Sequence, residues 1–346
     1  NVIGPEGSFF DVVASLTSFI SGGTYKVSRQ TASVAISQSP LSLSLFANGS
    51  SDYISHLGDS VQYTIEYKNN SDTVMQNVKI QAKIIGELFD LSGIRSDGNF
   101  NSLNNAITWF PATNRELLSV PSQQGGSVGF SIRVKNAFPI RLLSDKNYTL
   151  KVQAQIESPT VPQNITADKT VSIAGIESKM AGKLDFVSEA LWRDAASGIL
   201  NSGQYPPRVN QPTQFTIHWR VVNYATDVNN VHVSAYLQSG ARLTGTIKST
   251  ADTQPVYNPN SGLVTWDIPF IPATKGFISP PPEAIFQIEV TPSSNQIDSD
   301  VIFLGETTVE WTDSFVGQTG QATARELDTS VPADTTIGNV SRSVQP

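Results

Sequence analysis

The feature that most constrains this fold is a strand pattern that occurs twice. The two copies read Gln-Tyr-Thr-Ile-Glu-Tyr over residues 62–67 and Gln-Phe-Thr-Ile-His-Trp over residues 214–219. In both copies, aromatic or β-branched residues alternate with polar ones. A period of two places every second side chain on the same face, which is typical of a half-buried β-strand. The repeat predicts two copies of one β-domain, each with this segment as its central strand.

Other segments repeat in the same order and support two equivalent domains. Residues 107–109 (Ile-Thr-Trp) match residues 264–266 (Val-Thr-Trp), and the alternating stretch 130–134 matches 286–290. Short strands separated by frequent turn residues, with few helical patterns, favour sandwiches over helical folds. We therefore expect an all-β fold of tandem immunoglobulin-like β-sandwiches. The tryptophans of the apolar strand faces should lie in the cores: Trp109, Trp219 and Trp266.

The repeat also sets the expected domain boundaries. Residues 39–175 form the first sandwich and residues 176–317 the second. Residues 318–346 are polar and carry few large apolar side chains, so they are expected to be a tail or extended arm.

Residues 1–38 are harder to interpret, because their apolar residues fit both helical spacing and strict alternation. Comparison within the chain favours strands: residues 10–18 repeat the pattern of residues 150–158, and residues 31–35 repeat that of 170–174. We interpret residues 1–38 as the last strands of a partial preceding β-domain, or as a segment donated to another subunit. A helix is the alternative.

The composition limits the partners and the cellular locations to be expected for this chain. The net charge of −7 disfavours nucleic acid and anionic membranes as partners. The chain has no cysteine, which fits an exported prokaryotic protein, and no apolar run long enough to span a bilayer.

The chain resembles the "conserved repeat domain" of prokaryotic cell-surface proteins, as in large membrane-anchored surface proteins of uncultured small-genome bacteria. Residues 57–69, 77–78 and 107–109 carry the resemblance, with a weaker copy at residues 210–217. It implies the fold and an extracellular, cell-surface location. It implies no activity and no site residues.

Catalytic signals are weak, and no enzymatic activity is expected. The three histidines, His56, His218 and His232, do not cluster in the sequence. His218 falls on the polar face of its strand and is expected to be solvated. The nearest approach to an acidic pair is Glu306 and Glu310 with Asp313, for which a solvated face is the simpler interpretation.

Neither a cofactor nor a resident metal is expected. Calcium is the alternative, since loop carboxylates and carbonyls bind it in many sandwiches. The loop oxygens concerned are those of Asp52 and Asp59 in one loop, and of Asp227, Asn229 and Asn230 in another.

Four residues are candidates for contacts outside the chain. Asn48 and Asn69 begin Asn-x-Ser sequons in turns, where glycans could attach. Trp192 and Tyr205 flank a long insertion over residues 195–211 and are expected at the surface. There they would contact a neighbouring domain or protein, or stack on a glycan.

Three functions remain open from the sequence. The leading hypothesis is a structural subunit of an extracellular layer or filament that self-associates through strand pairing and domain contacts. The second is an adhesin that binds a glycan or a surface protein, and the third is an accessory region of a larger surface enzyme. A Lys–Asn bond within a sandwich is a further hypothesis.

Overall fold

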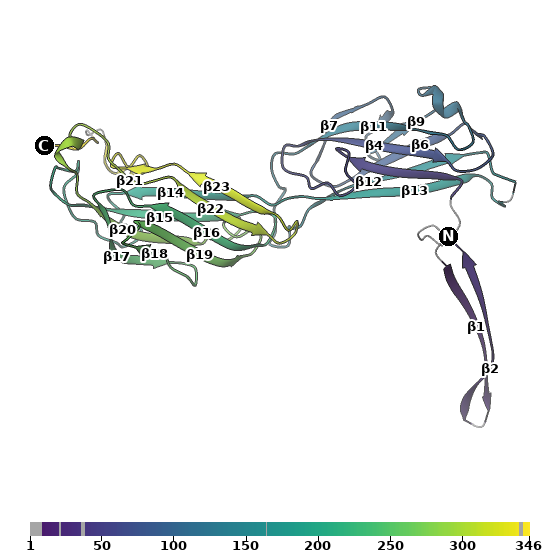
Figure 1. Ribbon diagram of the computed structural model, residues 1–346, viewed down its shortest axis with the longest axis horizontal. Helices are drawn as coiled ribbons and strands as arrows, with labels where there is room; N and C mark the ends of the chain where they lie inside the picture. Colours follow the sequence, from purple (N-terminus) through teal and green to yellow (C-terminus); the bar gives the residue numbers. More distant parts are fainter. Residues whose placement is uncertain (1–8, 21, 36–38, 164, 339–341) are drawn as a thin grey trace.

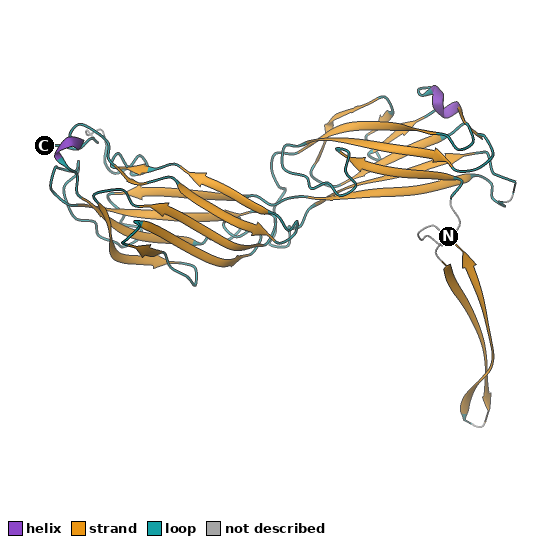
Figure 2. Cartoon of the chain, in the orientation of Figure 1, coloured by secondary structure: helices purple, strands orange, loops and turns teal. Residues whose placement is uncertain are grey.

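The computed structural model describes residues 9–20, 22–35, 39–163, 165–338 and 342–346, and these residues are nearly all β (Figure 2). Two β-sandwiches follow one another along the chain, preceded by a long hairpin (Figure 1). Each sandwich encloses its own hydrophobic core. The predicted fold class is confirmed: the chain forms tandem immunoglobulin-like sandwiches. No helix in these ranges has the length and apolarity of a membrane span.

The first sandwich consists of a four-stranded and a five-stranded antiparallel sheet. The four-stranded sheet has the order β3 (Leu41–Ala47), β4 (Ser60–Asn69), β11 (Gly125–Val134), β7 (Phe89–Ser96). The five-stranded sheet has the order β13 (Thr170–Lys179), β12 (Thr149–Ser158), β6 (Lys79–Ile85), β9 (Ala106–Trp109), β8 (Asn99–Asn101). A small ladder joins β5 (Met75–Gln76) to β10 (Ser119–Val120), which follows the 3-10 helix η1 (Arg115–Leu118).

The second sandwich repeats this order strand for strand. Its four-stranded sheet is β14 (Leu184–Leu191), β15 (Thr213–Asn223), β20 (Glu283–Val290), β17 (Ala241–Ser249). Its five-stranded sheet is β23 (Thr319–Ala324), β22 (Thr307–Asp313), β16 (Val228–Tyr236), β19 (Leu263–Ile271), β18 (Val256–Asn258). The remaining elements are η2 (Ser294–Gln296) and the pair β21 (Ile302–Leu304) and β24 (Leu327–Asp328).

The predicted central strands are β4 and β15, and alternation sorts their side chains into a core face and an outer face. Trp109, Trp219 and Trp266 are fully buried, as expected from the sequence. The two central strands are nevertheless displaced by two residues relative to the sequence match. Phe130 of β11 lies opposite Tyr63, whereas its counterpart Phe286 of β20 lies opposite Ile217 rather than Phe215. A shift of two leaves every side chain on its own face, so the alternation could not reveal it.

Two predicted boundaries need correction. The boundary between residues 175 and 176 falls inside β13, which continues to Lys179. Residues 319–324, expected to begin a tail or arm, form β23 and pair with β22 as the counterpart of β13. This strand looked like a tail because its inward positions are small. A side chain at Gly320 would collide with the Trp311 ring, since a Cβ there would lie 2.4 Å from two ring carbons.

The rest of the expected tail also packs on the second sandwich. Val331 and Val344 are fully buried, and Ile337 is nearly so. Gln345 pairs with Arg208 of the long β14–β15 connection. A few apolar residues, spaced too far apart to show a period, therefore anchor a mostly polar segment.

Strands β1 (Phe9–Ile20) and β2 (Gly23–Ala35) form a hairpin. Residues 1–8 and 36–38 of the predicted segment lie outside the described residues. The structure thus has strands in the segment for which a helix was the alternative. Figure 1 shows the hairpin extending away from the first sandwich. Among the hairpin residues whose side chains the structure describes (11–19, 22–24 and 26–33), none belongs to either hydrophobic core. Its interpretation as part of a preceding domain, or as a donated segment, stays a prediction.

Hydrogen bonds and an ion pair join the two sandwiches where the first ends and the second begins. Asn147 of the first donates its backbone N–H to the carbonyl of Ala225, whose side chain is buried in the first core. Lys146 forms an ion pair of 2.8 Å with Asp227. Asp313, itself buried, accepts hydrogen bonds from the backbone N–H of Gly182 and the hydroxyl of Thr226. These contacts fix the end of one sandwich against the start of the next.

Candidate functional site

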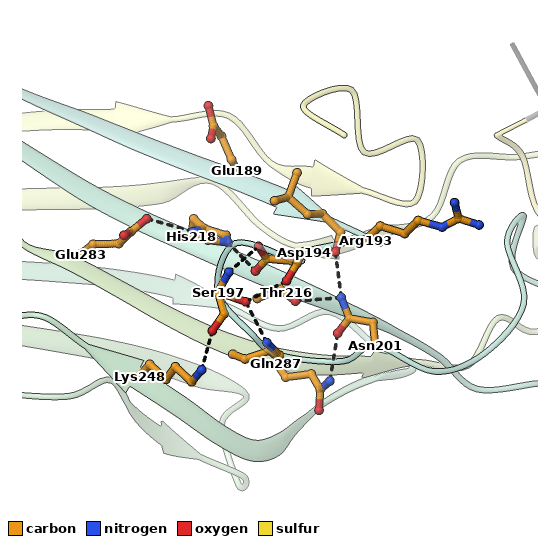
Figure 3. Close-up of polar contacts among 12 residues, drawn as sticks. Glu189, Arg193, Asp194, Ser197, Asn201, Thr216, His218, Lys248, Glu283 and Gln287 are labelled. Atoms are coloured by element: carbon orange, nitrogen blue, oxygen red, sulfur yellow. Dashed lines mark hydrogen bonds and ion pairs between the residues drawn. The ribbon is translucent and has the colours of Figure 1, made fainter. Parts of the chain in front are cut away.

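The most unusual feature of the second sandwich is a polar cluster on the outer face of its four-stranded sheet. Such a face is normally solvated. Here residues 192–212, the connection between β14 and β15, cross it; we call this segment the strap. The side chains beneath it are shown in Figure 3. Four of the polar residues there are buried: Asp194, Thr216, His218 and Gln287.

His218 of β15 lies at the centre of the cluster. Its Nδ1 is 2.9 Å from Glu283 Oε1 and its Nε2 is 2.8 Å from Asp194 Oδ2 (Figure 3). Each ring nitrogen of His218 is thus within hydrogen-bond distance of a carboxylate oxygen, one from the strap and one from β20. The expectation that His218 is a solvated strand residue was wrong, because the strap covers it.

Asp194 anchors the start of the strap. Burial by itself would raise the pKa of Asp194, but hydrogen bonds from Ser197 and His218 outweigh it and the pKa is lowered. The carboxyl is therefore ionised at neutral pH. Lys248 of β17 donates to the carbonyl of Ser197 and ties the same turn to the edge of the sheet.

Asn201 fixes the middle of the strap. Its side-chain amide donates to the Thr216 hydroxyl at 2.7 Å and accepts from the Gln287 side-chain nitrogen at 2.9 Å (Figure 3). It also donates to the carbonyls of Leu191 and Trp192. One strap residue thus hydrogen-bonds to buried polar side chains on two neighbouring strands, Thr216 of β15 and Gln287 of β20.

Arg220 extends the charged network toward the surface. It forms an ion pair with Glu189 of β14, and its Nη1 lies 3.8 Å from Glu283 Oε1. Glu283 thus lies between His218 and Arg220.

The contacts of this cluster connect the strap to the sheet. A histidine acting as general base needs one free nitrogen to accept a proton, and both nitrogens of His218 are within hydrogen-bond distance of a carboxylate oxygen. Within the described residues, no group of three or more His, Cys, Asp or Glu side chains is arranged to hold a metal ion. The cluster is built to attach the strap.

The rings of Trp192 and Tyr205 contact each other and are partly buried by the second sandwich. Their ring centroids are 5.2 Å apart, and Arg193 lies over the Trp192 ring. Asp334 accepts hydrogen bonds from the backbone N–H groups of Trp192 and Arg193. Both rings pack against the second core, so they are less exposed than expected. A glycan or protein contact through them stays a prediction.

Tyr205 is held by the C-terminal segment. Its hydroxyl donates to the carbonyl of Thr329 at 3.0 Å, and burial raises its pKa to about 12. The contacts of this aromatic pair therefore lie within the second sandwich. They do not support the expected contact with a neighbouring domain.

The two glycosylation candidates, Asn48 and Asn69, differ in solvent exposure. Asn48 is an exposed turn residue whose side-chain oxygen Oδ1 accepts from Gln62 N–H, and its modification stays a prediction. Asn69 is fully buried, with its side-chain nitrogen 2.8–3.1 Å from three backbone carbonyl oxygens. Asn223 makes the same arrangement in the second sandwich, at 2.7–3.1 Å. Asn69 is thus a structural residue, and the folded protein cannot present it to a glycosylating enzyme.

Several of the remaining sequence candidates have protein partners. Asp59 accepts from the Tyr53 hydroxyl and from His56 N–H, and Asp227 accepts from Ala273 N–H as well as from Lys146. His232 pairs with Asp267 at 2.6 Å. Asp313, for which a solvated face was expected, is instead buried and accepts hydrogen bonds from Gly182 N–H and the Thr226 hydroxyl. Calcium binding stays untested, as does the Lys–Asn bond, although no lysine of the described ranges is buried.

Comparisons with known proteins identify no family for this chain. No family model and no curated protein matches it. Similar solved structures include the C-terminal domain of the Streptococcus pyogenes antigen I/II-family protein AspA, at 11% identity, covering 83% of this chain and 99% of that one, with a TM-score of 0.34. The C-terminal domain of the Streptococcus agalactiae AgI/II polypeptide BspA has 10% identity, coverages of 82% and 98%, and a TM-score of 0.29.

A third similar structure is the full-length major pilin SpaD from Corynebacterium diphtheriae. It is 6% identical, covers 74% of this chain and 59% of that one, and has a TM-score of 0.29. At these values none of the three supports an argument about function. The resemblance to the conserved repeat domain stays a prediction.

Proposed function

We propose that this chain is a non-enzymatic structural subunit of an extracellular surface layer or filament. The observation that carries the proposal is the hairpin β1–β2. In the described part of the chain, each of its strands pairs only with the other. Both outer edges therefore present backbone N–H and C=O groups, which are the groups that recruit a further strand.

The hairpin also exposes apolar side chains that a folded domain would bury. Val12, Leu16 and Phe19 are 52%, 63% and 74% exposed. A two-stranded hairpin is at best marginally stable alone in water, so this one gains most by pairing with another subunit. Strand pairing through main-chain hydrogen bonds needs no particular ligand.

The two connected sandwiches have the properties of a spacer within an assembly. Each has a complete core, and the backbone and ion-pair contacts between residues 146–147, 182, 225–227 and 313 connect them. A subunit built this way would hold its neighbours at a fixed distance and in a fixed orientation. Catalysis is not part of the proposal, since the most elaborate polar cluster attaches a segment of the chain.

The test is electron microscopy of negatively stained protein, with and without residues 1–38. We expect filaments or sheets from the full chain and dispersed particles from the truncated one. Neither core includes a described side chain of the hairpin, so the truncated protein should keep the thermal transitions of the two sandwiches. Equal assembly of both proteins, or dispersed particles from both, would reject the proposal.

A further inference from the structure

We propose that Asn48 is a site of spontaneous deamidation, at which the side-chain amide is lost and an aspartate or an isoaspartate forms. Asn48 and Gly49 are the central residues of the tight turn that follows β3, and Asn48 is exposed to solvent. Ala47 and Ser50 flank the turn and exchange two backbone hydrogen bonds, of 2.9 and 3.0 Å. This chemistry is independent of the proposed function and needs no partner protein.

The reaction uses only atoms of the turn and water. The backbone nitrogen of Gly49 attacks Cγ of Asn48 and gives up its proton, so that a C–N bond forms, the Cγ–Nδ2 bond breaks and ammonia leaves. The product is a five-membered succinimide ring. Water then opens this ring at one of its two carbonyls. Opening at Cγ restores the main chain and leaves an aspartate, whereas opening at the backbone carbonyl leaves an isoaspartate.

The attacking nitrogen is free in the folded turn. The N–H groups on either side of it are engaged, since Asn48 donates to the Gln62 carbonyl and Ser50 to the Ala47 carbonyl. In the described part of the chain, the Gly49 N–H has no hydrogen-bond acceptor. A Cβ built at Gly49 would meet nothing within 4 Å, so the space around this residue is open. Glycine also rotates through backbone conformations that a side chain would prevent.

The carbonyl under attack is polarised by the fold. The backbone N–H of Gln62, in β4, donates to Asn48 Oδ1 at 2.8 Å. Negative charge develops on this oxygen when the nitrogen adds to Cγ, and a positioned N–H donor stabilises such a charge. The hydrogen bond that fixes the turn thus also activates its amide.

Other asparagines in left-handed conformation separate the effect of the glycine from that of the backbone. Asn48 has a φ of 48°, and five further asparagines have φ between 49° and 58°: Asn77, Asn105, Asn147, Asn210 and Asn230. Each of these five is followed by a residue with a side chain, and Asn48 begins the only Asn-Gly pair of the sequence. We therefore expect the reaction at Asn48 and not at the others.

Asp97 and Gly98 show that a following glycine is not sufficient. The carboxylate of Asp97 accepts from Trp109 Nε1 at 2.8 Å. A Cβ at Gly98 would lie 2.7–2.8 Å from side-chain atoms of Ile107 and Trp109. This glycine is enclosed where Gly49 is open, so we expect no isoaspartate at position 97.

The two products change the turn differently. An aspartate keeps an oxygen for the Gln62 N–H and adds one negative charge. An isoaspartate lengthens the main chain by one carbon atom, so Ala47 and Ser50 can no longer keep both of their mutual hydrogen bonds. Because β3 is at the edge of its sheet, we expect the isoaspartate form to loosen the end of this strand. A glycan on Asn48 would occupy the nitrogen that must leave, so the two modifications exclude each other.

Peptide mapping by mass spectrometry, after incubation of the folded full chain in mildly alkaline buffer, tests the site. The peptide containing residue 48 should gain the mass difference between an amide and an acid and separate into two chromatographic forms. Its conversion should be at least about tenfold faster than that of the five other asparagines, since only Asn48 precedes a glycine. Hydrogen exchange of the β4 amides before incubation verifies that the protein is folded.

Gly49→Ala is the matched variant. The open space around residue 49 accommodates the methyl group, although the φ of +78° is unfavourable for alanine. The variant should convert at least about tenfold more slowly, because the added Cβ restricts the approach of the nitrogen to Cγ. Equal rates in the two proteins, or equal rates at Asn48 and at the other five asparagines, would overturn the inference. Conversion that occurs only after unfolding in urea would also overturn it, since the folded turn would then protect the amide.

Discussion

At the scale of single residues, the contacts of His218 with Asp194 and Glu283 have the largest expected effect on stability. Removing His218, Asp194 and Glu283 from water is costly, and only their close contacts and the additional hydrogen bonds repay that cost. Asp194 depends most on its partners because it is 5% exposed. Loss of His218 would remove a close contact from both carboxylates at once.

We predict that His218→Ala lowers the free energy of unfolding of the second sandwich by about 3–5 kcal/mol, the usual cost of removing one partner of a buried pair. His232→Ala is the control, since the pair it forms with Asp267 is exposed and should be worth less than about 1 kcal/mol. Urea denaturation, with hydrogen exchange of the β15 amides to assign the transition, measures both. Equal losses would contradict the structural role of His218.

Asp334 provides a pH-dependent attachment of the C-terminal segment. Burial alone would raise the pKa of Asp334, but hydrogen bonds from Thr336, Arg193 and Trp192 outweigh it and lower the pKa. A carboxyl whose folded pKa is depressed stabilises the fold above its unfolded pKa, about 3.9. That stabilisation is lost as the pH falls through the lower folded pKa.

We therefore expect Asp334→Asn to melt at a lower temperature than the wild type at neutral pH. The difference should shrink as the pH falls through and below the usual range of aspartate, because the wild-type carboxyl then loses its charge as well. Thermal melts across this pH range measure it. A difference that is constant with pH would mean that the charge of Asp334 does not matter.

At the scale of elements, edge strand β23 shows how small residues allow a strand to pack. Gly320 lies against the Trp311 ring, and a methyl group at this position would overlap ring carbons. The strand can approach β22 only because this position has no side chain.

We predict that Gly320→Ala costs about 1–3 kcal/mol, in the range of overpacking substitutions, and loosens β23 before the rest of the sheet. Hydrogen exchange of the β23 amides would show this as faster exchange. Gln321→Ala, one residue on and exposed, should leave the exchange unchanged. Protection of β23 in the glycine variant equal to that of the wild type would refute the packing explanation.

At the scale of the whole molecule, hydrogen bonds at the junction limit the movement of one sandwich relative to the other. Asp313 accepts from Gly182 N–H at 2.7 Å and from the Thr226 hydroxyl at 2.9 Å. It also accepts from Phe315 N–H at 2.8 Å. One carboxylate thus joins the linker to two loops of the second sandwich.

We predict that Asp313→Ala frees the linker and broadens the distribution of distances between the sandwiches. Small-angle X-ray scattering would show the broader distribution. Glu310→Ala, on the outer part of the same strand, is the control and should scatter like the wild type. Identical scattering from all three proteins would mean that the other junction contacts suffice.

Much of the fold was predictable because alternation is a local property. The two sandwiches, the central strands and the buried tryptophans all follow from side chains two residues apart. The site was not predictable in the same way. His218 looked like a residue of a solvated strand face, and only the path of the strap shows that the face is covered. Asn69 looked like a turn residue open to modification, and its three carbonyl partners include Val120 and Pro121.

The sequence by itself determined the all-β class, the repeat and the face on which each strand residue lies, because these depend on periods that a single strand displays. Tertiary structure alone decided the two-residue displacement of the central strands, the place of β23 and the burial of the polar cluster. The physical reason is that each of these depends on contacts between segments far apart in the chain. A shift of two preserves the alternation, small residues give no hydrophobic signal, and a loop shows no period that reveals what it covers.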